Sequence, residues 1–249
     1  MKVIIRVAFV LAFRLVLTAC QPPLPGALES VEPEVITVQV TPAVEHWLPR
    51  VAACAQEIPD FGVYARVRPR ADLAGEDSDL VLRLGERMEG DVFVAVMGSE
   101  EIVLVAGRDV PTAALSLESL QAIYAGEISD WADVPEARVN PGAGVAPIVP
   151  LAYPAEHEMT FLFRKAFLHD AAIPSAVQTF STVGFLEELL ALYPTGIGFL
   201  LQGQATEGMR IVPIDAETPI ASKQYVLAVT SQAPEGRLKA LLTCLQSAQ

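Results

Sequence analysis

The sequence predicts an α/β protein. Short runs of β-branched and apolar residues alternate with amphipathic stretches from residue 35 to the C-terminus. Apolar residues make up 52% of the chain, which is enough for a full core. The length of 249 residues allows either one large domain or two lobes of about 100 residues each.

The first strand is predicted at residues 35–40, and the first helix at 42–52. Thr41 stands at the expected N-cap and Pro42 at the first helical position, where proline is tolerated. The turn lies at the carboxyl end of a strand, and the start of the helix offers free N–H groups to an anion or a polar ligand. Thr41 is therefore a candidate ligand residue, and plain capping is the alternative.

Further strands are expected at 61–68 and 80–84, the second of them closed by Gly85. Residues 92–96 and 102–106 are two more strand candidates, and a turn is expected between them at 98–101.

A helix is predicted from the Ser116 cap to Gly126, which ends it. A strand at 147–153 and a helix at 159–168 follow, and Ser181 or Thr182 caps another helix. The remaining expected elements are three strands and a last helix, at 196–200, 211–214, 225–229 and 236–245.

The net charge of −13 and the pI of about 4.6 exclude the usual nucleic-acid and anionic-lipid binders, which need clustered Lys and Arg. The densest basic run is Arg66, Arg68 and Arg70. Apolar residues and a proline separate its members, so we interpret it as one polar face of a strand.

The N-terminus is interpreted as a sorting signal over residues 1–20. Lys2 and Arg6 precede an apolar run that is too short to span a bilayer. The run ends in Leu17-Thr18-Ala19-Cys20, which is similar to the bacterial lipobox, so Cys20 is expected to carry a lipid. A plain secretory signal or an uncleaved anchor is the alternative. Residues 21–34 are rich in proline and are expected to be a flexible tether, which places the domain outside the cytoplasm on a membrane.

Residues 115–131, LSLESLQAIYAGEISDW, resemble a signature of the phosphate-type periplasmic solute-binding proteins, and residues 194–200 resemble a second element of that family. The resemblance implies a type 2 two-lobed fold in which each lobe is a mixed sheet flanked by helices. Lobe I would comprise 35–108 and 209–249, and lobe II 109–208. It also implies a ligand held between hinged lobes and delivery to an ABC transporter permease.

The turn before residue 159 departs from that family. The Gly-Ser-Gly-Thr string that grips the oxyanion in the relatives is replaced by Pro154-Ala155-Glu156-His157, and the place of the family's arginine falls near Leu151. Glu156 and Glu158 stand there instead. Each carboxylate–phosphate pair would cost roughly 4 kcal/mol at about 4 Å. Tight phosphate binding is therefore not expected, and a cationic or hydrogen-bond-donating ligand is favoured. The residues expected to line the cleft are Thr41, Gly85, Ala155, Glu156, His157 and Thr182.

Apart from Cys20, the chain holds Cys54 and Cys244, both on predicted helices of the first lobe. A disulfide between them is expected in an oxidising compartment, and two buried thiols are the alternative.

No nucleophile elbow, zinc-protease motif, P-loop or dinucleotide fingerprint occurs, and only three histidines are present. The protein is expected to be no enzyme, to use no cofactor or metal, to bind no nucleic acid and to be a monomer. The predicted function is capture of a small solute for an ABC importer. The alternative is a degenerate binding domain that serves as a sensory or interaction module.

Overall fold

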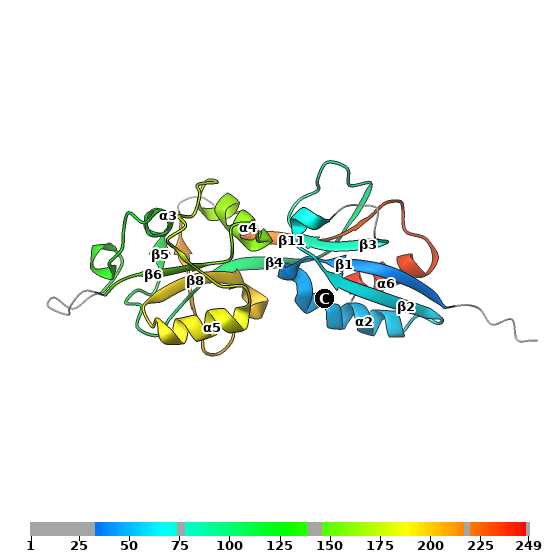
Figure 1. Cartoon of the computed structure of the whole chain (residues 1–249), viewed down its shortest axis with the longest axis horizontal. Helices are drawn as coiled ribbons and strands as arrows, with labels where there is room; N and C mark the ends of the chain where they lie inside the picture. The colour runs from blue at the N-terminus through cyan, green and yellow to red at the C-terminus, as the bar shows by residue number, and fades with distance from the viewer. Residues whose placement is uncertain (1–32, 74–77, 139–145, 217–219, 248–249) are drawn as a thin grey trace, which may run out of the picture. The chain divides into compact units, whose positions relative to one another are not determined.

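One mixed sheet organises the fold (Figure 1). The computed structural model describes residues 33–73, 78–138, 146–216 and 220–247, and residues 35–249 form one unit. In the described residues nine strands pair in the order β2-β1-β3-β11-β4-β8-β6-β7, with β9 also on β4. Cys20 and the expected signal and tether lie outside the described residues.

We call the elements on one side of β4 the first half. It comprises β1 (Glu34–Val40), the 3₁₀ helix η1 (Pro42–Trp47), α2 (Leu48–Gln56), β2 (Phe61–Val67), η2 (Arg70–Asp72), β3 (Leu80–Leu84), β11 (Lys223–Thr230) and α6 (Gly236–Ser247). β1 and β3 are parallel, whereas β11 runs antiparallel to both β3 and β4. The half is thus built from two ends of the chain.

The second half lies on the other side of β4. It comprises β5 (Leu115–Ser116), α3 (Leu117–Ala125), η3 (Trp131–Asp133), β6 (Val149–Ala152), α4 (Glu158–Phe167), β7 (Gln178–Thr179), α5 (Val183–Leu192), β8 (Gly196–Leu201), η4 (Gln202–Gln204), β9 (Arg210–Val212) and β10 (Ile214–Asp215). β5 and β10 form a separate two-stranded sheet. The predicted lobe boundaries near 108 and 208 stay a prediction.

β4 (Phe93–Ala106) belongs to both halves. Its residues 93–101 pair with β11, and 102–106 pair with β8 (Figure 1). The expected turn at 98–101 is wrong, because the chain continues as one strand there. The register skips Met97, a fully buried residue at an irregularity opposite Val226 and Leu227. Pairing on both sides overrides the local turn preference of Gly98 and Ser99.

The helix caps of the second half follow the sequence. The Ser116 hydroxyl accepts the Ser119 N–H at 3.1 Å, and Gly126 ends α3 in the left-handed region at φ 79°. Trp131 is fully buried and donates its indole N–H to the Thr195 carbonyl at 2.9 Å. This bond ties the exit of α3 to the turn before β8.

Close backbone approach also requires glycine near the crossing strand. A Cβ atom at Gly107 would lie 2.4 Å from the Pro194 carbonyl oxygen, a distance that no side chain tolerates. Gly107 also donates its N–H to the Gly196 carbonyl. The end of β4 and the start of β8 are therefore held in direct backbone contact.

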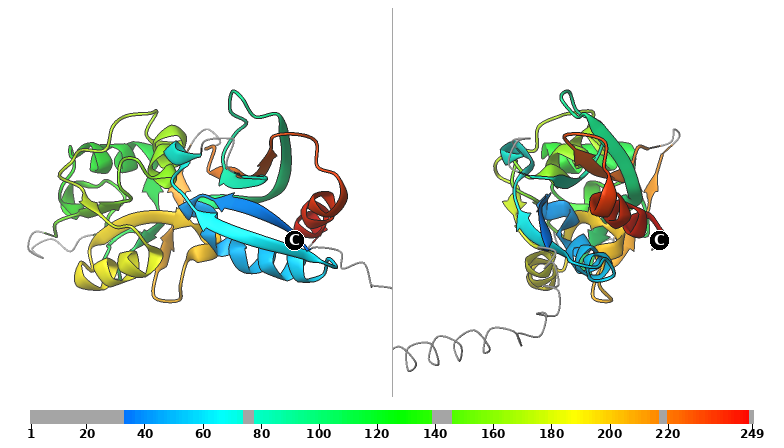
Figure 2. Two further views of the ribbon diagram at one scale, coloured as in Figure 1. Left: turned by 45° about the vertical axis from the view of Figure 1, so that its right-hand side comes forward. Right: turned by 90° about the vertical axis from the view of Figure 1, so that its right-hand side faces the viewer.

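The two terminal helices of the first half lie side by side (Figure 2). The predicted disulfide between Cys54 of α2 and Cys244 of α6 is present. The Arg50 guanidinium also donates to the Leu245 carbonyl. Two helices 190 residues apart in sequence are thus joined covalently and by a hydrogen bond.

Aromatic packing fills the second half. Phe163 of α4 stacks on Phe199 of β8 with ring centroids 3.8 Å apart, and Tyr124 of α3 meets Phe163 edge-on at 5.0 Å. Tyr153 adds contacts with Phe180 and Phe199. These rings join α3, α4 and β8, and the Tyr124 hydroxyl also donates to backbone carbonyls of β6 and β8.

Candidate functional site

The first turn of α4 carries a buried carboxylate. Glu158 is the first residue of the helix and only 2% exposed. Its Oε2 accepts the Thr41 hydroxyl at 2.5 Å, across a separation of 117 residues. Thr41 follows β1 and is fully buried. This hydrogen bond links α4 of the second half to the residue that follows β1 in the first half.

The structure corrects the capping interpretation of Thr41. Its hydroxyl makes no cap hydrogen bond, and the chain begins a 3₁₀ helix at Pro42 before α2 starts at Leu48. Proline does occupy the first helical position, as predicted. The Thr41 hydroxyl is instead used for the contact with Glu158.

Among the described residues, Arg70 forms the ion pair with the Glu158 carboxylate. It begins η2, and its Nη1 lies 3.7 Å from Glu158 Oε1. Its guanidinium also stands over the Phe161 ring of α4, 5.1 Å from the centroid. Arg70 therefore does not belong to a solvated strand face, which is where the sequence placed it. It contacts the second half twice.

This charged contact is incompletely satisfied. Glu158 Oε1 and Arg70 Nη1 are both buried, and neither has a hydrogen-bond partner in the described residues. A distance of 3.7 Å is too long for a hydrogen bond between them. Their attraction is therefore electrostatic only, with a polar gap left between the two groups.

Burial shifts the pKa values of both Glu158 and Arg70. Desolvation raises the pKa of Glu158, while the Thr41 hydroxyl, the two guanidiniums of Arg70 and Arg83, and the Leu84 backbone act in the opposite direction. Desolvation also lowers the pKa of Arg70, and Glu158 opposes that change. Each partner thus favours its neutral form through burial and its charged form through the other.

Gly85 lies beside this cluster. Its φ is 102°, and a Cβ atom there would lie 3.3 Å from Leu162 of α4 and 3.5 Å from Arg70 Nη1. A cavity of about 180 Å³ adjoins it. Arg70, Gly85 and Gln224 of the first half and Phe161 and Lys165 of α4 are among its walls.

The remaining predicted cleft residues lie elsewhere or play other parts. Ala155 and Glu156 are exposed, and the Thr182 hydroxyl caps α5 by accepting the Phe185 N–H at 3.2 Å. His157 caps α4 through Nδ1, which accepts the Met159 N–H at 3.1 Å. Of the six, only Thr41 and Gly85 meet at the Glu158 cluster.

His157 is held in its neutral form. Its ring stacks on Tyr153 with centroids 4.4 Å apart. Burial lowers its pKa to about 4, against an opposing effect of Glu156. No group of three metal-ligating side chains occurs among the described residues.

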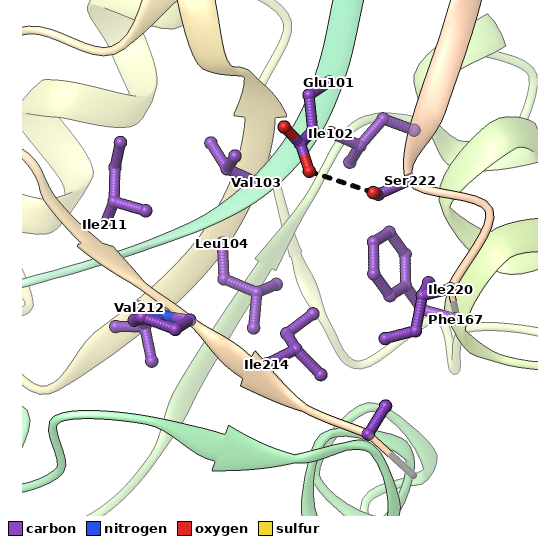
Figure 3. A pocket seen from close by; sticks show the side chains of 12 residues that line it. Glu101, Ile102, Val103, Leu104, Phe167, Ile211, Val212, Ile214, Ile220 and Ser222 are labelled. Atoms are coloured by element: carbon purple, nitrogen blue, oxygen red, sulfur yellow. Dashed lines mark hydrogen bonds between the residues drawn. The ribbon is translucent and has the colours of Figure 1, made fainter. Parts of the chain in front are cut away.

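A second and larger cavity, of about 550 Å³, lies beside β4 (Figure 3). Its walls are mostly apolar side chains, including Ile102, Leu104 and Ile214. Its polar groups include Glu101, whose carboxylate accepts the Ser222 hydroxyl at 3.1 Å. The two polar side chains of this cavity bond to each other, whereas Glu158 and Arg70 keep buried polar atoms without partners, so the candidate site is the Glu158 cluster.

The cleft residues predicted from the sequence do not include Glu158 or Arg70. Glu158 had been recognised as a carboxylate at the helix start, but only its neighbour Glu156 was placed in the cleft. Arg70 follows Pro69 and lies beyond the end of β2, at the start of η2.

No family model matches this sequence, and no curated protein matches it either. Solved structures do. A phosphate transport receptor from Vibrio cholerae aligns with TM-score 0.68 at 15% identity, covering 86% of this chain and 94% of the receptor. A protein from Clostridium perfringens, described as a phosphate ABC transporter substrate-binding protein with bound phosphate, aligns with TM-score 0.69 at 16% identity over 85% and 93%.

The chain has the two-lobed fold of the type 2 periplasmic binding proteins. The reduced form of OxyR from N. meningitidis also aligns, with TM-score 0.60 at 13% identity over 86% of this chain and 95% of that one. The fold is therefore shared by transport receptors and by regulatory domains, and it leaves the function to be argued from the site.

Proposed function

We propose that the protein is an extracytoplasmic solute-binding protein. It captures a small solute between its two lobes and delivers it to the permease of an ABC importer. The lipid on Cys20 anchors it to the membrane through the tether at 21–34. The leader sequence supports the location, and the fold shared with the phosphate receptors supports the solute-binding role.

The observation that carries this proposal is the polar junction between the halves. Thr41, Gly85 and Arg70 come from the first half, and Glu158 and Phe161 from α4. The junction adjoins a cavity of about 180 Å³, which suits a small solute with a few polar groups. Closure of the halves around such a solute is the motion expected for this fold.

The proposed solute class rests on the buried carboxylate at the junction. Glu158 is buried there, and the adjoining cavity is lined by Glu86 together with the basic side chains of Arg70, Arg87 and Lys165. A phosphate dianion would meet at least one carboxylate at close range, at a cost of roughly 4 kcal/mol at about 4 Å. A cationic or hydrogen-bond-donating solute would instead complement the unpaired Oε1 of Glu158. The oxyanion-binding motif of the phosphate family is thus replaced.

A panel of solutes added to the native protein tests this proposal. Amino acids, polyamines, metals and oxyanions would be compared by the shift they cause in the thermal midpoint. A cationic or donor solute is expected to raise the midpoint by several degrees at a hundred times its Kd. A rise caused by micromolar phosphate would contradict the proposed solute class.

The second candidate function is a sensory or protein-interaction module without a transport role. The bond from Thr41 to Glu158 favours it, because this contact joins the halves with the chain's own side chains. The match to OxyR regulatory domains is a further parallel in fold. A panel in which no solute shifts the midpoint, together with a gene neighbourhood without permease and ATPase genes, would favour this candidate.

The anchor has its own test. Cys20→Ser removes the thiol that would accept the lipid, so the variant is expected in the soluble fraction while the native protein partitions with membranes. A variant that still partitions with membranes would show that the lipid assignment is wrong.

A further inference from the structure

Three hydrogen-bond donors converge on the Glu158 carboxylate. The Thr41 hydroxyl donates to Oε2 at 2.5 Å, the Leu84 backbone favours the charged form of the carboxylate, and the Arg70 guanidinium stands 3.7 Å from Oε1. All three belong to the first half, while the carboxylate belongs to α4. A hydroxyl, a backbone amide and a guanidinium are the groups by which proteins bind oxyanions.

We propose that this donor set is an oxyanion-binding subsite of the first half, and that Glu158 is its built-in occupant. The carboxylate reaches the subsite from the other half and takes the place that a free small oxyanion would fill. This inference deepens the proposed function, because it concerns the same cleft and explains why the native protein should reject oxyanions.

The fit of the occupant supports this interpretation. The carboxylate satisfies the hydroxyl but leaves its own Oε1 and Arg70 Nη1 without hydrogen-bond partners. Burying charged groups without full pairing is unfavourable. Glu158 is fixed to the first turn of α4, so its carboxylate cannot move freely toward the guanidinium. An untethered oxyanion is free to contact all three donors.

The neighbouring carboxylate provides an internal contrast. Glu156 lies two residues earlier, before the His157 cap, and is exposed, and its carboxylate contacts none of these three groups in the described structure. The donors thus select one carboxylate of the pair.

Substitution of Glu158 by alanine tests the proposal. Glu158→Ala removes a CH₂–COO⁻ group, which is the size of acetate. Acetate, phosphate and sulfate would each be titrated into the native protein and the variant by calorimetry, with thermal midpoints as a second readout. We expect at least one of the three to bind the variant about tenfold or more tightly than the native protein. The anion that binds best identifies the chemistry of the subsite.

Two further variants separate this subsite from a general charge effect. Glu156→Ala removes the same number of atoms and the same charge two residues away, and it should gain no anion binding. Thr41→Val in the Glu158→Ala background removes the hydroxyl donor and should abolish most of the gain. Equal gains in Glu156→Ala and Glu158→Ala, or full binding without the hydroxyl, would overturn the proposal.

A folded variant is required for either answer. If Glu158→Ala is too unstable for titration, Glu158→Ser keeps a polar group that suits the first turn of a helix. Absence of binding of all three anions to a folded Glu158 variant would overturn the proposal. The proposed function is tested separately, because the solute panel uses the native protein and these titrations use the variants.

Discussion

Each half of the fold is stabilised internally, and by different interactions. The first half is assembled from both ends of the described chain, and a disulfide joins its helices α2 and α6. The second half is one continuous stretch of sequence between β4 and β11, and stacked aromatic rings fill its core. Covalent closure thus accompanies the half whose parts are far apart in sequence, whereas aromatic packing and hydrogen bonds from Tyr124 and Trp131 hold the other.

Removing the disulfide should have the largest effect. In Cys54→Ser with Cys244→Ser, the closed loop of about 190 residues is released, and the chain-entropy model gives a loss of about 5 kcal/mol in the free energy of unfolding. Hydrogen exchange should locate the loss in α2 and α6. Equal loss of protection in α5 would show that the halves are not separately stabilised.

Removing one ring should weaken the other half. Phe163→Ala deletes a fully buried side chain between Tyr124 and Phe199 and should lower the free energy of unfolding by about 3 to 5 kcal/mol. Phe185→Ala, on the exposed side of α5, is the matched control and should have less than about 1 kcal/mol of effect. Faster exchange confined to α3, α4 and β8 would sharpen the contrast between the halves.

The junction between the halves should respond to pH through Glu158. Because burial raises its pKa, the group favours folding at pH values below its unfolded pKa, and that contribution is lost as the pH rises through the folded pKa. Compared with Glu158→Gln, the native protein should therefore gain stability as the medium is acidified.

At neutral pH the same substitution should change the free energy of unfolding by only about 1 kcal/mol. The charge-assisted bond from Thr41 is lost, but so is the cost of burying the charge. Denaturant titrations at several pH values would measure both effects. Glu156→Gln is the control and should show neither; an identical pH dependence in the two variants would contradict the assignment.

The smallest effect is expected at His157. NMR titration of its ring should give a pKa of about 4. Since this pKa is lowered, the stabilising contribution is present above the unfolded value and is lost as the pH falls from about 6.5 toward 4. Glu156→Gln should lower the pKa of His157 further, because Glu156 favours its charged form. A ring pKa near 6.5 would mean that the stacking on Tyr153 does not bury it.

Local patterns were sufficient to predict most elements. The caps Ser116 and Gly126, the strand at β3 and the glycine at 85 follow from residues that act within a few positions of themselves. The continuous strand β4 did not follow, because its pairing with β11 and β8 outweighs the turn preference near Gly98. That preference is visible in the sequence, and the pairing is not.

The candidate site was only half predictable for the same reason. Thr41 was identified from its place after β1, and a carboxylate was expected at the start of α4. The contact between Thr41 and Glu158 spans 117 residues, and the approach of Arg70 depends on how η2 leaves β2. Such long-range contacts are determined by the fold, so the local spacing of residues does not predict them.

The position of β11 bears on how the protein is made. This strand lies between β3 and β4, yet it comes from residues 223–230. During synthesis from the N-terminus, β1, β2 and β3 emerge early but have no central partner until residues 223–230 have been made. The continuous half can fold first. A nascent chain stalled before residue 223 would therefore present an intact aromatic core beside an open, unpaired sheet edge, which is a substrate for chaperones and proteases.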